Sequence, residues 1–155
     1  MKYLKDEFCS HSEFDKHKEK LWDTALQRYW KEFLRIKHKF PKEFIAEITE
    51  GRGFHDSFIK HIAIDENKPG EYSLKLVLSY DDIVKPQGEM QIIMRNISNL
   101  KLDDIIGQYW TYNEFLPKKK GRLSLEVKFS PNEGFMYVEF ESLEYFCKPA
   151  GTAPI

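Results

Sequence analysis

The hydrophobic residues of this chain change their spacing about one third of the way along it, and that change decides which elements the chain can form. Over residues 12–38 they recur at intervals of three and four, which is typical of one apolar face on a long amphipathic helix. The residues on this face are Phe14, Leu21, Trp22, Ala25, Leu26, Tyr29, Trp30, Phe33 and Ile36.

A second, shorter helix is predicted directly after the first one. Pro41 suits the first turn of a helix, because its missing N–H is not needed there. The residues that follow supply three apolar side chains at helical spacing, Phe44, Ile45 and Ile48. Residues 50–53, with the sequence EGRG, predict its end, since glycine tolerates the left-handed backbone that stops helices.

From Gly53 onward the hydrophobic residues alternate with polar ones, which is typical of strands with one buried face. Residues 66–71 (ENKPGE) and 130–134 (SPNEG) have the composition of turns. The second of these turns predicts a hairpin. The predicted strands cover residues 58–64, 72–80, 89–97, 123–129 and 135–142.

These elements predict one α+β domain. A strand with one polar face needs a cover on its other face only, and the aromatic-rich long helix is a natural cover. We therefore expect a helical layer (residues 12–49) on one face of an antiparallel sheet of about five strands (residues 54–146). The long helix is expected to pack on the leucines of residues 74–78 and on Leu125 and Val127. The domain is expected to span residues 1–148, with residues 149–155 as a flexible tail.

Composition and charge exclude several classes of protein. The chain has 24 basic and 25 acidic residues, and neither side of residue 50 has the excess of positive charge that nucleic-acid binding usually needs. The one basic run, residues 117–122 (PKKKGR), is interpreted as a solvated loop. No apolar run approaches the roughly 20 residues of a membrane helix. Cys9 and Cys147 are too few for a disulfide framework, which favours the cytoplasm.

His55 and Asp56 stand where the chain leaves the glycine-rich turn, and a pair of this kind raises the question of catalysis or metal binding. Neighbouring residues of a strand point to opposite faces, so the two side chains are not expected to share a metal or to act as a dyad. His61 is too far along the strand to join His55 on one ion. We expect the pair to organise the turn, with no bound metal or cofactor.

Two acidic pairs keep an enzymatic alternative open. Asp81–Asp82 and Asp103–Asp104 both follow apolar segments, and carboxylate oxygens suit magnesium or calcium. Acidic residues after strands are also ordinary turn formers. The alternative function is therefore a small metal-dependent hydrolase that uses His55, Asp56 and one acidic pair.

Residues 105–117 (IIGQYWTYNEFLP) are the most suggestive segment for binding. They crowd aromatic residues into a stretch without clean periodicity, and aromatic side chains with polar atoms are common at recognition surfaces. The same residues also suit a loop that folds back and closes the open end of the sheet core. Both interpretations can hold for different residues. The candidate binding residues are Tyr109, Trp110, Tyr112 and Glu114.

The sequence FPKEFIAEITEGRGFHDSFIKHIAI (residues 40–64), the strand that ends near Asn96 and Ile97, and the segment YWTYNEF (residues 109–115) resemble a family of bacterial proteins called domain of unknown function 4085. The resemblance covers roughly residues 40–146. This chain departs from the family by its single long helix, where the family has a longer helical N-terminal region. The family implies the fold and a bacterial cytoplasmic setting, but no reaction.

Similar small α+β proteins also occur as immunity proteins beside bacterial toxins. We therefore expect a non-catalytic protein that binds another protein, such as a toxin or another cytoplasmic protein, and that binds neither nucleic acid nor a membrane. The sequence does not give the identity of the partner or the oligomeric state.

Overall fold

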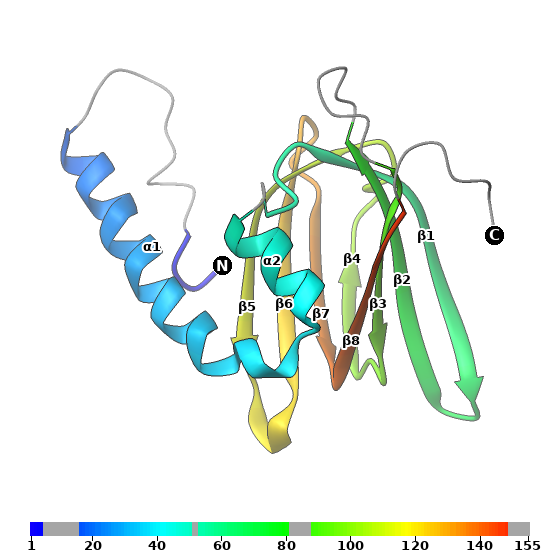
Figure 1. The fold of residues 1–155 in the computed structure, drawn as a ribbon. Coiled ribbons are helices and arrows are strands. Elements are labelled where there is room, and N and C mark those ends of the chain that lie inside the picture. Colours follow the sequence, from blue (N-terminus) through cyan, green and yellow to red (C-terminus); the bar gives the residue numbers. More distant parts are fainter. Residues whose placement is uncertain (5–15, 51–52, 81–87, 149–155) are drawn as a thin grey trace.

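A computed structural model describes residues 1–4, 16–50, 53–80 and 88–148. Its N-terminal part is helical and the rest forms one antiparallel sheet, so the α+β class and the helical layer on the sheet are confirmed. The long helix α1 spans Lys16–Ile36, a short 3-10 helix η2 spans Lys37–Lys39, and α2 spans Lys42–Glu50 (Figure 1).

The sheet has eight strands, where about five were expected. Their order is β4-β7-β6-β5-β1-β2-β3-β8, and all described pairs are antiparallel. The additional strands are β5, which lies in the segment without clean periodicity, and two short strands that follow bends. The strands are β1 (Ser57–Lys68), β2 (Glu71–Tyr80), β3 (Met90–Arg95), β4 (Asn99–Leu102), β5 (Tyr109–Pro117), β6 (Leu123–Ser130), β7 (Phe135–Phe140) and β8 (Ser142–Cys147).

β4 and β8 are the two outermost strands of this order. Each continues, after a bend, a strand that lies near the other end of the order. β3 bends into β4 and β7 bends into β8, so that the pairing of β3 with β8 runs on into the pairing of β4 with β7. The two bends are joined by hydrogen bonds from the Glu141 N–H to the Arg95 carbonyl (3.0 Å) and from the Ser98 N–H to the Glu139 carbonyl (2.9 Å). The sheet therefore curls round on itself (Figure 1).

The core lies on the inner face of this curled sheet. Alternate residues of β2, β3, β6 and β7 are buried, as the alternating sequence predicts. Helix α2 contributes Phe44, whose ring lies 5.4 Å from those of Phe54 and Phe115 and 5.6 Å from that of Tyr145. The buried strand residues are Leu74, Leu76, Leu78, Met90, Ile92, Met94, Leu123, Leu125, Val127, Met136, Val138 and Phe140.

Helix α1 packs on β5, and not on the leucines of β2 as expected. β5 pairs with β1 only at Phe58↔Tyr109 among the described residues, so the later part of β5 has no strand on that side. There the hydroxyl of Tyr29 accepts a hydrogen bond from the Phe115 N–H (3.2 Å). The Phe33 ring lies 6.3 Å from that of Phe115. Helix α1 thus supplies a hydrogen-bond partner to a backbone N–H of this strand edge and covers an edge that would otherwise be exposed.

The two predicted turns lie where they were expected, since β1 and β2 form one hairpin and β6 and β7 another. The basic run before β6 forms a short exposed 3-10 turn, η3 (Lys119–Gly121). Residues 12–15, the expected start of the long helix, lie outside the described residues. Among the described residues, no helix is both long and apolar enough to cross a membrane.

Candidate functional site

The segment of candidate binding residues is a strand, β5, with a bulge in its middle. Trp110 is paired with Phe129 of β6 and Tyr112 with Lys128, so Thr111 is an extra residue without an opposite partner. A bulge of this kind shifts the alternation of inward and outward side chains by one. It explains why the aromatic residues showed no clean period in the sequence, and it corrects the interpretation of the segment as a loop.

Trp110 is part of the core and has no exposed surface. Its ring centre lies 5.4 Å from that of Phe54 and 5.8 Å from that of Phe129. Its indole N–H donates to Asn113 Oδ1 at 2.9 Å, which satisfies the one polar atom of the ring. Trp110 therefore stabilises the fold and offers no surface to a partner.

Glu114 is also fully buried, although it points to the outer face of the sheet. Its carboxylate accepts hydrogen bonds from the backbone N–H groups of Lys2 and Tyr3, both at 2.7 Å, and from that of Leu4. The neighbouring carboxylate of Glu126 contacts the ammonium group of Met1. Glu114 thus fastens residues 1–4 to the outer face of β5, which is a structural role.

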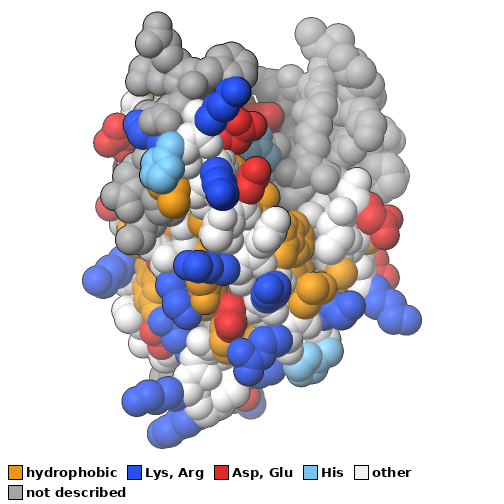
Figure 2. Space-filling view, turned by 90° about the vertical axis from the view of Figure 1, so that its left-hand side faces the viewer, with side chains coloured by type: hydrophobic (Ala, Val, Ile, Leu, Met, Phe, Trp, Pro, Cys, Tyr) orange, Lys and Arg blue, Asp and Glu red, His pale blue; other side chains and the backbone are white. Residues whose placement is uncertain are grey.

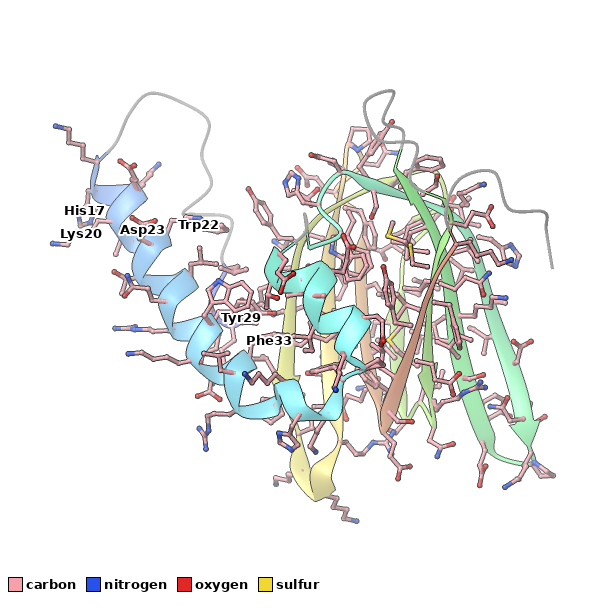
Figure 3. All side chains as sticks on the ribbon, in the orientation of Figure 1. His17, Lys20, Trp22, Asp23, Tyr29 and Phe33 are labelled. Carbon is pink, nitrogen blue, oxygen red and sulfur yellow. The ribbon has the colours of Figure 1, made fainter. Side chains whose placement is uncertain are left out.

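The other two candidates reach the surface. Tyr109 is 39% exposed and its ring lies 6.2 Å from that of Phe58. Tyr112 is half-buried on the outer face of β5, with its ring 5.2 Å from Trp22 of α1 and 6.1 Å from His55. Figure 3 shows Trp22, Tyr29 and Phe33 directed from α1 toward the sheet, whereas His17 and Lys20 point away from it.

Three side chains form one cluster here: Trp22, His55 and Tyr112. A groove lies beside this cluster, and we call the cluster and the groove together the Tyr112 surface. The groove has a volume of about 540 Å³ and is open to solvent. Its polar lining contains one basic side chain, one acidic side chain and three hydroxyl groups. The lining residues include Thr111, Tyr112, Lys128, Ser130, Glu133 and Phe135.

His55 and Asp56 lie in the turn before β1 and not in the strand, so the argument from strand alternation was wrong. The Nδ1 atom of His55 lies 2.9 Å from Oδ1 of Asp56, and the two side chains are 49% and 64% exposed. The backbone organises the turn: the Asp56 N–H donates to the Trp110 carbonyl (3.0 Å), and the Ser57 N–H to the Phe54 carbonyl (3.0 Å). Positive φ angles at Gly53 and Phe54 produce the tight bend.

The parts of the alternative metal site are not brought together in the described part of the chain. Asp81 and Asp82 lie outside the described residues. Oδ2 of Asp103 accepts a hydrogen bond from the Phe135 N–H at 3.0 Å, as a turn-forming aspartate does. No group of three or more His, Cys, Asp or Glu side chains that could hold a metal ion occurs among the described residues.

Sequence reasoning missed the contributions of Trp22, Lys128 and Glu133 to this surface. Trp22 was assigned to the core face of the helix, and Lys128 to the polar face of a strand. Both assignments are correct, but neither indicates that the two residues lie near each other. The one available signal was the hairpin, because it places residues 128 and 133 beside β5 once β5 is recognised as a strand.

Comparison of the chain with protein-family models, with curated protein sequences and with solved structures gives no match.

Proposed function

We propose that the protein acts by binding another protein, without catalysing a reaction, and that the Tyr112 surface makes the contact. The observation that carries this proposal is the place of Tyr112: its ring forms part of the wall of an open groove, on a strand that is anchored to the core by Trp110 and Phe115 on either side.

A tyrosine held in this way is suited to an interface. Aromatic side chains supply a large contact area at a small cost in conformational entropy, and residues of this type dominate the binding energy of many interfaces. The contacts with Trp22 and His55 restrain the Tyr112 ring before any partner arrives. Lys128 and Glu133 place opposite charges at the groove, so that a partner must match both to bind well.

The class of partner is inferred from the resemblance to a bacterial family and to immunity proteins. On that ground the proposed partner is a bacterial cytoplasmic protein such as a toxin, which the protein would bind and occlude. Occlusion needs contact residues and no catalytic group. The metal-dependent alternative requires ligands that the described residues do not gather, so it is not pursued.

The test is to capture the partner from the source bacterium with the parent protein and with two variants. Tyr112→Ala removes the aromatic contact, and Thr111→Arg fills the groove while leaving the Tyr112 ring in place. We expect each variant to lower the affinity by about 30-fold, equivalent to roughly 2 kcal/mol. Tyr72→Ala, at an exposed tyrosine of β2, is the matched control and should bind like the parent.

A melting curve of each variant separates binding from folding. If Thr111→Arg keeps the melting temperature and the full affinity, the groove is not the contact. If Tyr112→Ala loses stability in step with affinity while Thr111→Arg binds normally, Tyr112 is a core residue and the proposal is wrong.

A further inference from the structure

Positive charge is concentrated in two segments of the chain that lie far apart in the sequence. Residues 16–39 and 118–122 together contain twelve basic and three acidic residues, a formal charge of +9. The remaining residues contain twelve basic and 22 acidic residues, a formal charge of −10. The net charge of −1 conceals this separation, and so does a division of the chain at residue 50.

The fold brings the two segments together. Helix α1 buries Tyr29 and Phe33 against the sheet, whereas its basic residues Arg28, Lys31 and Arg35 are exposed. At the end of α1 the chain enters η2, where Lys39 donates a hydrogen bond from Nζ to the Gly121 carbonyl in the η3 turn. Figure 2, which looks onto the α1 side of the molecule, shows more blue than red side chains over the described part of this face.

We define the basic surface as six exposed side chains around this contact: Lys31, Arg35, Lys37, Lys39, Lys119 and Lys120. Only Arg35 of these six has a carboxylate within ion-pair distance among the described residues, Glu32 at 3.4 Å. Nearby, Lys118 lies 4.0 Å from Glu139 at the edge of the same turn. Five of the six cations are therefore not neutralised by the described part of the chain.

One large apolar side chain is exposed on α1 beside two of these cations. Leu34 is 51% exposed, and on α1 it directly precedes Arg35 and lies about one helical turn after Lys31. A nucleic-acid backbone offers phosphate oxygens to a basic surface and makes no use of an exposed leucine beside the cations. An acidic protein segment with an apolar side chain matches both features, because its carboxylates pair with the cations while its apolar side chain covers the leucine.

We propose that the basic surface binds an acidic protein segment that presents an apolar side chain to Leu34. This goes beyond the function proposed for the Tyr112 surface, because it names a second surface and the charge of what binds there. The cations steer an acidic segment toward the surface over a distance of about one Debye length, and the leucine contact adds affinity that salt does not screen.

The experiment measures binding of four labelled probes by fluorescence anisotropy: an acidic helical peptide with leucines on one face, the same peptide with those leucines replaced by glutamine, a short DNA duplex, and vesicles of phosphatidylserine and phosphatidylcholine. The leucine-containing peptide should bind most tightly. The triple variant Lys31→Glu, Lys37→Glu, Lys119→Glu should weaken its binding about tenfold or more.

Two controls make the result specific. The triple variant Lys60→Glu, Lys68→Glu, Lys75→Glu changes the net charge equally, on β1 and β2, which carry none of the six cations, and should leave binding nearly unchanged. Leu34→Ser should weaken only the leucine-containing peptide. Equal losses in the two triple variants, no effect of Leu34→Ser, or tighter binding of DNA or vesicles than of the peptide would overturn the proposal. All of these variants leave Thr111 and Tyr112 intact, so failure here is separate from failure of the proposed function.

Discussion

At the scale of single residues, two of the side chains that suggested a binding site are used by the fold itself. Trp110 fills the core and Glu114 binds the backbone of residues 2–4, while Tyr109 and Tyr112 remain at the surface. The sequence identified the right segment, because aromatic residues with polar atoms do gather there. The sequence could not show which of these residues are buried and which are at the surface, because the bulge at Thr111 decides which side chains point inward.

Glu114 provides the first prediction. Glu114→Gln keeps the shape of the side chain but removes its charge and turns an amide N–H toward the backbone N–H groups of residues 2–4. The variant should lose about 1–3 kcal/mol of unfolding free energy, as expected for a buried hydrogen-bonded group left partly unsatisfied. Urea unfolding measures the loss. Glu133→Gln, at an exposed acidic residue, is the control, and equal midpoints for the two variants would contradict the structural role of Glu114.

His55 and Asp56 provide the second prediction. Because both side chains are largely exposed and the backbone holds the turn, His55→Ala should change the unfolding free energy by less than about 0.5 kcal/mol. Elemental analysis of the purified parent protein should show no stoichiometric transition metal. A metal that is present in the parent and lost in His55→Ala would revive the hydrolase alternative.

At the scale of elements, the helices and most strands were predicted by hydrophobic spacing, because that spacing reports which face of an element is buried. The spacing does not report what the face is buried against. The apolar face of α1 was correct, but its neighbour is the free side of β5. The short strands β4 and β8 follow bends near Asn96 and Glu141, and only the pairing across the bends reveals them.

The contrast between the neighbouring residues Phe33 and Leu34 tests how α1 is placed. Phe33 is fully buried against Phe40 and Phe115, whereas Leu34 faces outward. Phe33→Ala should lower the unfolding free energy by about 3–5 kcal/mol, and Leu34→Ala should change it little. Thermal or urea unfolding of both variants gives the comparison. Similar stability of the two would mean that α1 is not packed on β5.

Tyr29 makes stability depend on pH in the alkaline range. Burial raises the pKa of its hydroxyl above the ordinary value of 10.0. In the unfolded chain the tyrosine loses its proton at about pH 10, whereas in the folded protein it keeps the proton at that pH. The contribution of Tyr29 to the free energy of unfolding is therefore fully present below pH 10 and falls as the pH rises further.

Tyr29→Phe should reduce this alkaline loss of stability. At neutral pH the same variant should cost about 1–3 kcal/mol, because the buried Phe115 N–H then has no acceptor. Unfolding free energies measured from neutral to alkaline pH test both effects. Tyr109→Phe, at an exposed tyrosine of β5, is the control and should change neither the neutral stability nor the slope, and a Tyr29→Phe profile parallel to that of the parent would refute the assignment.

At the scale of the whole molecule, the curled sheet leaves two different surfaces beside α1. The Tyr112 surface lies where Trp22 meets β5, and the basic surface lies where η2 meets η3. The first combines a restrained aromatic ring with charges of both signs, and the second is positive with an exposed leucine. Neither could be read from the sequence, because each joins residues from elements that are distant along the chain.

The function proposed for the protein is binding of a partner protein through the Tyr112 surface. The most direct measurement is hydroxyl-radical footprinting of the protein, alone and in complex with the captured partner, with the oxidation of each tyrosine read by mass spectrometry. We expect the partner to protect Tyr112 and to leave Tyr72 on β2 oxidised as before. Unchanged oxidation of Tyr112 in the complex would contradict binding through the Tyr112 surface.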